Sequence, residues 1–143
     1  MQTTQAYIAL GSNLDDPRQH VLTAIDELDV LPFTRVTAKS NLHQTKPLGP
    51  QDQPDFINAV VAIATQLAPL ALLHECLNLE IRHGRARRER WGPRTLDLDL
   101  LLYGDLHLTL PELVIPHPHM YEREFVLKPL AEIAPELVFE AAL

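Results

Sequence analysis

The order of strand-like and helix-like segments constrains the fold of this chain more than any other feature of its sequence. Short β-rich apolar runs alternate with amphipathic segments in the order strand, helix, strand, and this unit occurs twice. The expected strands cover residues 7–10, 34–44, 56–67 and 95–103, and the expected helices begin at Pro17 and Pro69. We therefore predict an α+β fold, a ferredoxin-like βαββαβ sandwich with an antiparallel sheet, helices on one face, and a small C-terminal α/β extension.

Apolar residues at helical spacing mark the faces that the two helices are expected to bury. They are Val21, Leu22, Ile25 and Leu28 in the first helix, and Leu70, Leu73, Leu77 and Ile81 in the second. Cys76 also lies on an apolar stripe, so we interpret it as a buried, inert thiol. Gly84 is expected to end the second helix, and short helical turns interrupted by Pro129 are expected over residues 120–134.

Length and composition suit one globular domain. The chain has 143 residues, of which 46% are hydrophobic and 22% charged, and this is sufficient for one apolar core. It has no apolar run near the ~20 residues that span a bilayer, and its N-terminus lacks a basic segment followed by an apolar one. We expect a single domain over residues 1–143, located in the cytoplasm. We also expect a monomer, because every apolar stripe has an obvious core partner.

Positive charge is concentrated in one short segment of a chain whose net charge is -7. Six of the twelve Lys and Arg residues fall within thirteen positions: Arg82, Arg85, Arg87, Arg88, Arg90 and Arg94. The overall acidity disfavours general binding to nucleic acid or acidic membranes, whereas the cluster favours a compact anionic target such as phosphate. The chain lacks a Gly-x-x-x-x-Gly-Lys-Ser/Thr loop, so side chains must neutralise that phosphate. The alternative is a solvated basic loop or an RNA contact.

Asp97 and Asp99 alternate with leucines in the last long strand, Leu96-Asp97-Leu98-Asp99-Leu100. Because side chains alternate along a strand, the leucines share one face and the two aspartates share the other, with Cβ atoms roughly 6.5–7 Å apart. Carboxylates at that spacing can converge on two cations about 3.5–4 Å apart, as in two-metal phosphoryl transfer. Oxygen ligands without a nearby Cys favour Mg²⁺. The alternative is the polar outer face of a half-exposed strand, although Asp is a poor strand former.

Phe56 and Asn58 lie on the strand face opposite Ile57. An aromatic ring beside an amide suits a flat heterocycle with amide-like edges, although Asn58 could equally bond to neighbouring backbone. Trp91, inside the arginine segment, is either a hydrophobic anchor or a stacking plate for a planar ligand. His117 and His119, in Pro-His-Pro-His, are candidates for binding a metal or, for His117, for a contact with phosphate.

These motifs together resemble a known enzyme family. The segment Arg90-Trp91-Gly92-Pro93-Arg94-Thr95-Leu96-Asp97-Leu98-Asp99-Leu100 is similar to the signature of 6-hydroxymethyl-7,8-dihydropterin pyrophosphokinase, a family of folate biosynthesis. The resemblance extends in the same order through residues 8–14, 47–58, 115–118 and 123–135. It covers nearly the whole chain, and the fold of the family is the α+β sandwich predicted above.

The resemblance implies Mg²⁺-dependent transfer of pyrophosphate from ATP to the hydroxymethyl group of the reduced pterin, with AMP released and neither nucleic acid nor membrane as a partner. Asp97 and Asp99 would hold two Mg²⁺, and Arg85 and Arg94 would stabilise the transferring group, so these four residues would be catalytic. The implied pterin-binding residues are Thr45, Leu48, Phe56, Asn58, Trp91 and Phe125. The implied ATP-binding residues are Leu73, Glu80, Arg85, Arg87, Trp91, Arg94, Leu100, Leu113, Val114, His117 and Arg123.

Two positions depart from the family pattern. Phe56 stands where some members have Tyr, which keeps the stacking and loses a hydroxyl. Pro118 replaces a Tyr found in part of the family, so we expect one ATP contact to be missing. The chain is shorter than many relatives, and we expect a final helix to be absent or trimmed. Two other hypotheses stay open: a ferredoxin-like RNA-binding module that uses the arginine segment, and a regulatory domain that binds a nucleotide without turnover.

Overall fold

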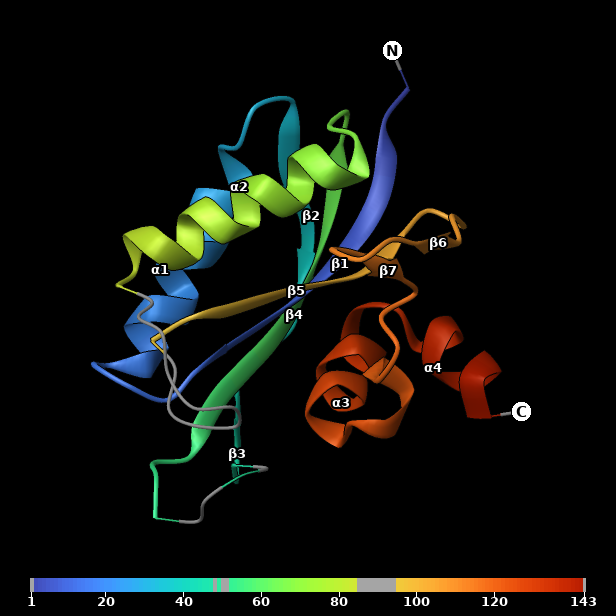
Figure 1. Cartoon of the computed structure of the whole chain (residues 1–143). Helices are drawn as coiled ribbons and strands as arrows, with labels where there is room; N and C mark the ends of the chain where they lie inside the picture. The colour runs from blue at the N-terminus through green and yellow to red at the C-terminus, as the bar shows by residue number, and fades with distance from the viewer. Residues whose placement is uncertain (1, 48, 50–51, 85–94, 143) are drawn as a thin grey trace.

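Figure 1 shows the computed structural model, which describes residues 2–47, 49, 52–84 and 95–142. The strands are β1 (Thr4–Ser12), β2 (Thr34–Lys39), β3 (His43–Thr45), β4 (Phe56–Thr65), β5 (Asp97–Tyr103), β6 (Leu108–Thr109) and β7 (Val114–Ile115). The helices are α1 (Pro17–Asp29), α2 (Pro69–Arg82), the 3-10 turn η1 (Met120–Glu122), α3 (Glu124–Ile133) and α4 (Pro135–Ala142). Among the described residues, no helix is both long and apolar enough to cross a bilayer.

The predicted order of strands and helices is confirmed, and the first two helices begin at Pro17 and Pro69 as expected. The strand predicted over residues 34–44 is two strands instead, β2 and β3. The ladder changes at Ser40, where the side-chain hydroxyl accepts a hydrogen bond from the N–H of Val60 at 3.0 Å. A side chain that takes the place of a backbone acceptor interrupts the strand without leaving the amide unpaired.

Strands β1 to β5 form one antiparallel sheet in which β2, β4, β1 and β5 are neighbours in that order. The short β3 also pairs with β4, next to Phe56 and Asn58, while β2 pairs with the far end of β4. Strands β6 and β7 form a separate two-stranded sheet. The result is a mixed α/β fold with an antiparallel sheet, and it is compatible with the predicted ferredoxin-like sandwich.

Helices α1 and α2 cover one face of the sheet and enclose the main core (Figure 1). Ile57, Val61 and Ile63 of β4 are buried in this core, as the period-two pattern predicts. The prediction of a buried Cys76 is confirmed, since it is 1% exposed. Burial, followed by the charges of Glu80, Asp99 and Glu75, raises the pKa of the Cys76 thiol to about 12, so it stays protonated at neutral pH.

The C-terminal helices α3 and α4 lie on the opposite face of the sheet, where the predicted fold placed no helix (Figure 1). Val60 of β4 and Leu101 of β5 pack there with Val126 and Leu130 of α3. Helix α3 runs through Pro129, so the predicted interruption is wrong. A proline inside a helix removes one i→i−4 hydrogen bond, and burial of the apolar face of α3 compensates for that loss.

The buried stripe of α2 differs from the predicted one. Leu77 and Ile81 are 43% and 66% exposed, whereas Leu72, Cys76 and Glu80 are buried. The helix is rotated so that a carboxylate faces the sheet, and a pattern based on hydrophobicity alone assigns that position to the solvent side. The premise of the monomer prediction, that every apolar stripe has a core partner, is therefore not met on α2.

Candidate active site

The end of β1 lies between the starts of β4 and β5, and the predicted polar residues gather at this point of the sheet. Gly11 on β1 pairs with Asn58 on β4 and, on its other side, with Asp97 on β5. Asp99 pairs with Ala9 in the same sheet. All of these positions alternate with residues of the main core, so their side chains share the face opposite α1 and α2.

The carboxylate pair has the arrangement that strand alternation predicts. Leu98 and Leu100 are 5% and 4% exposed and belong to the main core. Asp97 and Asp99 alternate with them and are half-buried on the other face. Their neighbours across β1 are the small residues Ala9 and Gly11, which occupy little space beside the two carboxylates. Strand β5 therefore presents two carboxylates, separated in sequence by one residue, on the same face of the sheet.

Gly11 is a site residue that the sequence analysis missed. A Cβ atom at this position would lie 3.0 Å from Oδ1 of Asn58 and 3.7 Å from Cδ1 of Phe56. The first distance is shorter than ordinary van der Waals contact, so a larger residue would displace the amide of Asn58. A glycine next to a β-rich run can mark such a close approach, but the sequence does not show which strand comes near.

Asn58 is buried, and its side chain has a fixed orientation. It is 5% exposed, and its Nδ2 donates to Oγ1 of Thr45 at 2.5 Å. Thr45 on β3 pairs in register with Phe56, so the three side chains come from adjacent positions of two neighbouring strands. The predicted combination of an aromatic ring and an amide is thus present as one unit, with a threonine hydroxyl added by β3.

A second amide links β1 to the segment that precedes β4. Asn13, directly after β1, donates from Nδ2 to Oε1 of Gln53 at 2.9 Å and to the carbonyl of Pro54 at 2.8 Å. Both Asn13 and Gln53 are buried, at 2% and 9% exposure. These two bonds hold residues 53–54 against the end of β1, immediately before Phe56. Sequence reasoning gave Asn13 no role, because the partner lies forty positions further along the chain.

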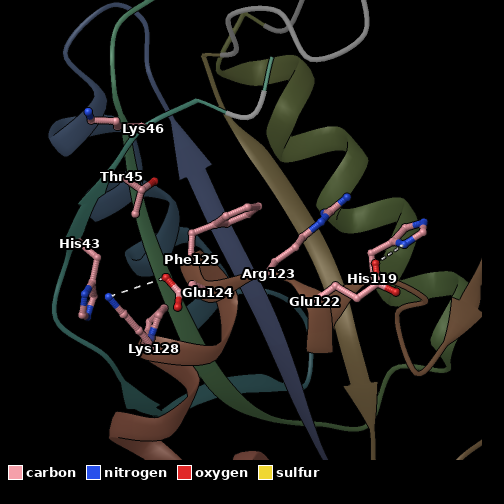
Figure 2. Close-up of a pocket in the computed structure, with 10 residues that line it drawn as sticks. His43, Thr45, Lys46, His119, Glu122, Arg123, Glu124, Phe125 and Lys128 are labelled. Atoms are coloured by element: carbon pink, nitrogen blue, oxygen red, sulfur yellow. Dashed lines mark hydrogen bonds and ion pairs between the residues drawn. The ribbon is translucent and has the colours of Figure 1, made fainter. Parts of the chain in front are cut away.

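A cavity of about 640 Å³ opens beside Thr45 between the strand β3 and the start of α3 (Figure 2). Thr45, Arg123 and Phe125, three residues of the predicted site, line it. The remaining lining residues are His43, Lys46, His119, Glu122, Glu124, Lys128 and Pro129. The guanidinium carbon of Arg123 lies 5.7 Å from the centre of the Phe125 ring, within the range of a cation–π contact. The cavity therefore combines an aromatic wall with several charged groups.

His117 lies between β7 and η1, and its backbone is fixed. Its N–H donates to the carbonyl of Leu101 at 2.9 Å, and its Nδ1 accepts from the N–H of His119 at 3.2 Å. Burial, and then the nearby charges of Arg123 and His119, lower the pKa of His117 from 6.5 to about 4. At neutral pH the ring is therefore uncharged, and with Nδ1 accepting, Nε2 carries the proton and can donate.

Comparison with known proteins assigns the family. The model of the family 7,8-dihydro-6-hydroxymethylpterin-pyrophosphokinase matches residues 7–135, which is most of the chain. The chain belongs to this family. The resemblance found in the sequence is thereby confirmed.

Three curated members of the pyrophosphokinase family are similar over most of their length, and each is named 2-amino-4-hydroxy-6-hydroxymethyldihydropteridine pyrophosphokinase. The protein of Pseudomonas aeruginosa is 53% identical over 133 residues, covering 93% of this chain and 82% of its own. That of Haemophilus influenzae is 51% identical, with 93% and 83% covered. That of Bacillus subtilis is 45% identical over 136 residues, with 95% and 81% covered.

The ATP-binding positions implied by the pyrophosphokinase pattern are spread over several elements. Leu73 of α2 packs against the main core, to which Leu100 of β5 and the buried Leu113 also belong. Val114 of β7 is 37% exposed. Glu80 is buried at the end of α2, and its Oε2 accepts from the N–H of Leu98 at 2.7 Å. The structure thus places Leu73, Leu100 and Leu113 in or against the main core. Glu80 lies against β5, the strand that carries Asp97 and Asp99.

Five predicted site residues lie outside the described part of the chain. They are Leu48 and, in the arginine segment, Arg85, Arg87, Trp91 and Arg94. Their roles remain those implied by the family pattern. Gly84, which directly precedes Arg85, has a φ of +86°, in keeping with the predicted end of α2.

Proposed function

We propose that this chain transfers pyrophosphate from ATP to the hydroxymethyl group of 6-hydroxymethyl-7,8-dihydropterin and releases AMP, a step of folate biosynthesis. The observation that carries this proposal is the family match over residues 7–135. The matched segment includes the positions of β1, β4 and β5 that meet at Gly11. The names of the curated relatives give the same pterin and the same type of reaction.

The pterin would stack between Phe56 and Phe125, with Asn58 and Thr45 contacting its polar edge. A pterin carries hydrogen-bond donors and acceptors side by side, and a carboxamide supplies one of each. Asn58 suits this role because its amide is buried and held by Thr45 at 2.5 Å. Backbone near Leu48 and the ring of Trp91 would complete the pocket.

Asp97 and Asp99 would hold two Mg²⁺ that contact the ATP phosphates. Carboxylate oxygens on one strand face fit this ion, which usually takes one or two protein carboxylates and fills its other positions with water and substrate phosphate. Within the described ranges no group of three or more His, Cys, Asp or Glu side chains is placed to hold a metal ion. When bound, magnesium would neutralise part of the triphosphate charge.

The reaction would be a displacement at the β-phosphorus of ATP. A bond forms between the pterin hydroxymethyl oxygen and this phosphorus, and the bond from the phosphorus to the α,β-bridging oxygen breaks. The electron pair leaves with AMP, and the hydroxyl proton passes to solvent. Positioning and charge neutralisation supply most of the acceleration in such transfers, so no strong general base is required.

Cationic and neutral donors of the chain would stabilise the transferring group. Arg85 and Arg94 would contact it directly, and Arg87 would lie on the same segment. Arg123 lines the cavity beside Phe125, and His117 is nearby with an uncharged ring that can donate from Nε2.

One assay tests the proposal against its alternatives. The protein is incubated with Mg-ATP and the reduced pterin, and the nucleotide products are separated. AMP in amounts equal to the pterin product is the expected result. ADP would indicate ordinary kinase chemistry, and no product together with nucleotide binding would indicate a regulatory domain. Salt-sensitive RNA binding without turnover would support the RNA-binding hypothesis instead.

The finer features of fold and setting are part of the same proposal. We infer a ferredoxin-like catalytic domain over residues 1–143 that acts as a monomer in the cytoplasm. The strand order and the two helices on one face support the topology. Exposed Leu77 and Ile81 make the oligomeric state worth measuring, and sedimentation equilibrium at micromolar concentration would decide it.

A further inference from the structure

Glu80 occupies an unusual position for a carboxylate. It lies in the last turn of α2, is 3% exposed, and shares the buried face of this helix with Leu72, Cys76 and Leu79. Its Oε2 accepts a hydrogen bond from the backbone N–H of Leu98 at 2.7 Å. Burying a carboxylate is costly unless it is bonded, so this contact is part of what allows a glutamate at the position.

The bond reaches the carboxylate strand at the residue between the two acids. Strand β5 is an edge strand of the described sheet: it is the last strand in the order and pairs with β1. Leu98 stands between Asp97 and Asp99, and its side chain is held in the main core. Glu80 adds a second restraint on this residue, through the backbone rather than through the side chain.

Edge strands are the least constrained part of a sheet, because one row of their backbone groups lacks a ladder partner. Without an acceptor from α2, the N–H of Leu98 would be a buried donor, or the strand would shift to find water. Either outcome would alter the direction of the neighbouring side chains.

We propose that Glu80 is a positioning residue for the carboxylate pair: its bond to the Leu98 N–H fixes the separation and direction of Asp97 and Asp99. The catalytic consequence rests on the proposed function, whereas the backbone restraint does not. This role differs from the nucleotide contact that the family pattern implies for Glu80. It predicts that the hydrogen bond, and not the charge, is what the site requires.

Two substitutions separate the bond from the charge. Glu80→Gln keeps an oxygen at the same reach and removes the charge. Glu80→Asp keeps the charge, but its side chain is one methylene shorter and cannot reach Leu98 in the same geometry. Glu75→Gln and Glu75→Asp on the same helix are the matched controls, since Glu75 is not among the buried residues of α2.

The first measurement is hydrogen exchange of the Leu98 amide by NMR in the metal-free protein. Glu80→Asp should speed this exchange at least about tenfold, while Glu80→Gln and the controls leave it near the wild-type rate.

The second measurement is turnover as a function of Mg²⁺. Glu80→Asp should lower kcat about tenfold or more and raise the Mg²⁺ needed for half-maximal rate, with the pterin KM unchanged, because small displacements of catalytic groups are costly. Glu80→Gln, which keeps an acceptor oxygen, should retain more of the wild-type kcat than Glu80→Asp.

Several results would overturn the proposal. If Glu80→Asp left the exchange rate of the Leu98 amide unchanged, Glu80 would not restrain the backbone of Leu98. A folded Glu80→Asp protein could also have a lower unfolding temperature but a normal kcat and a normal dependence on Mg²⁺. Glu80 would then have only a structural role. A raised ATP KM in both variants at constant kcat would indicate direct nucleotide contact. If the wild-type chain forms no AMP, the proposed function fails, and the exchange measurement still decides whether Glu80 holds Leu98.

Discussion

At the scale of single residues, placement separates Asp97 and Asp99 from the other acidic residues of the chain. They are half-buried on a strand whose alternate residues, Leu98 and Leu100, are fixed in the main core. Elsewhere in the described part of the chain, most acidic side chains are exposed. A pair carried by a strand that is fixed in this way is suited to hold cations at a constant separation, and this property can be tested by removing one charge at a time.

Asp97→Asn and Asp99→Asn should each lower the rate of AMP formation at least about a hundredfold, because each removes a charged ligand from the phosphate site. Asparagine has nearly the same shape, so the fold should be preserved, and circular dichroism should show an unchanged spectrum. Asp105→Asn, in the exposed turn after β5, is the matched control and should have wild-type activity. A near-normal rate in both site variants would refute the metal assignment.

Gly11→Ala should raise the KM for the pterin about tenfold and leave the KM for ATP nearly unchanged. The added Cβ would lie 3.0 Å from Oδ1 of Asn58 and would displace the amide that contacts the pterin edge. Overpacking of this kind costs about 1 kcal/mol or more of unfolding free energy, which urea denaturation would detect. Equal increases in both KM values would instead indicate a general distortion of the sheet.

At the scale of elements, the two helices on the main core are joined by polar contacts at the end of α2. His83, whose side chain is 8% exposed, contacts Oε1 of Glu27 on α1 through Nε2 at 2.5 Å. Its Nδ1 lies 2.7 Å from Nδ1 of His20, also on α1. These contacts lie immediately before Gly84, so they fix the end of α2 against α1.

His83→Ala should therefore lower the unfolding free energy by about 1–2 kcal/mol, because it leaves Glu27 and His20 without this partner. The change is measured by urea denaturation at neutral pH. His74→Ala on the same helix is the control, since His74 is exposed, and it should change stability by no more than about 0.5 kcal/mol. Equal losses in the two variants would mean that the helix surface, not the contact with α1, is responsible.

The elements also show what the sequence could predict and what it could not. Strand alternation placed Asp97 and Asp99 opposite the leucines, because this pattern depends only on neighbours along the chain. The rotation of α2 was mispredicted, because burial of Glu80 depends on a backbone donor in β5. Gly11 was missed for the same reason: its importance comes from the register with Asn58. Local periodicity was sufficient for the strand face, and contacts between distant segments decided the rest.

At the scale of the whole molecule, the pH dependence of stability follows from groups whose pKa differs between the folded and unfolded chain. His117 has a pKa of about 4 in the folded state, lowered by burial and then by Arg123 and His119, against 6.5 as its ordinary value. The unfolded chain therefore binds this proton more readily. Well above pH 6.5 the ring is uncharged in both states, and stability is unaffected by it. As the pH falls from 6.5 toward 4, the unfolded state gains protons first, and stability decreases.

The unfolding free energy of the wild type should consequently fall between about pH 7.5 and pH 5, and His117→Asn should lose less over the same interval. The upper pH of this interval lies above the ordinary pKa of His117. The lower pH lies above the ordinary pKa of Glu132, which is 4.5, and the hydrogen bond from the Asn41 N–H lowers the pKa of Glu132 further. Protonation of Glu132 therefore contributes little to the difference. His107→Asn, at an exposed position, is the control and should follow the wild type. Because His117 is partly exposed, solvent screening reduces the effect, so the comparison uses the difference between the two pH values within each protein. A His117→Asn protein whose acid sensitivity equals that of the wild type would show that other groups control stability in this range.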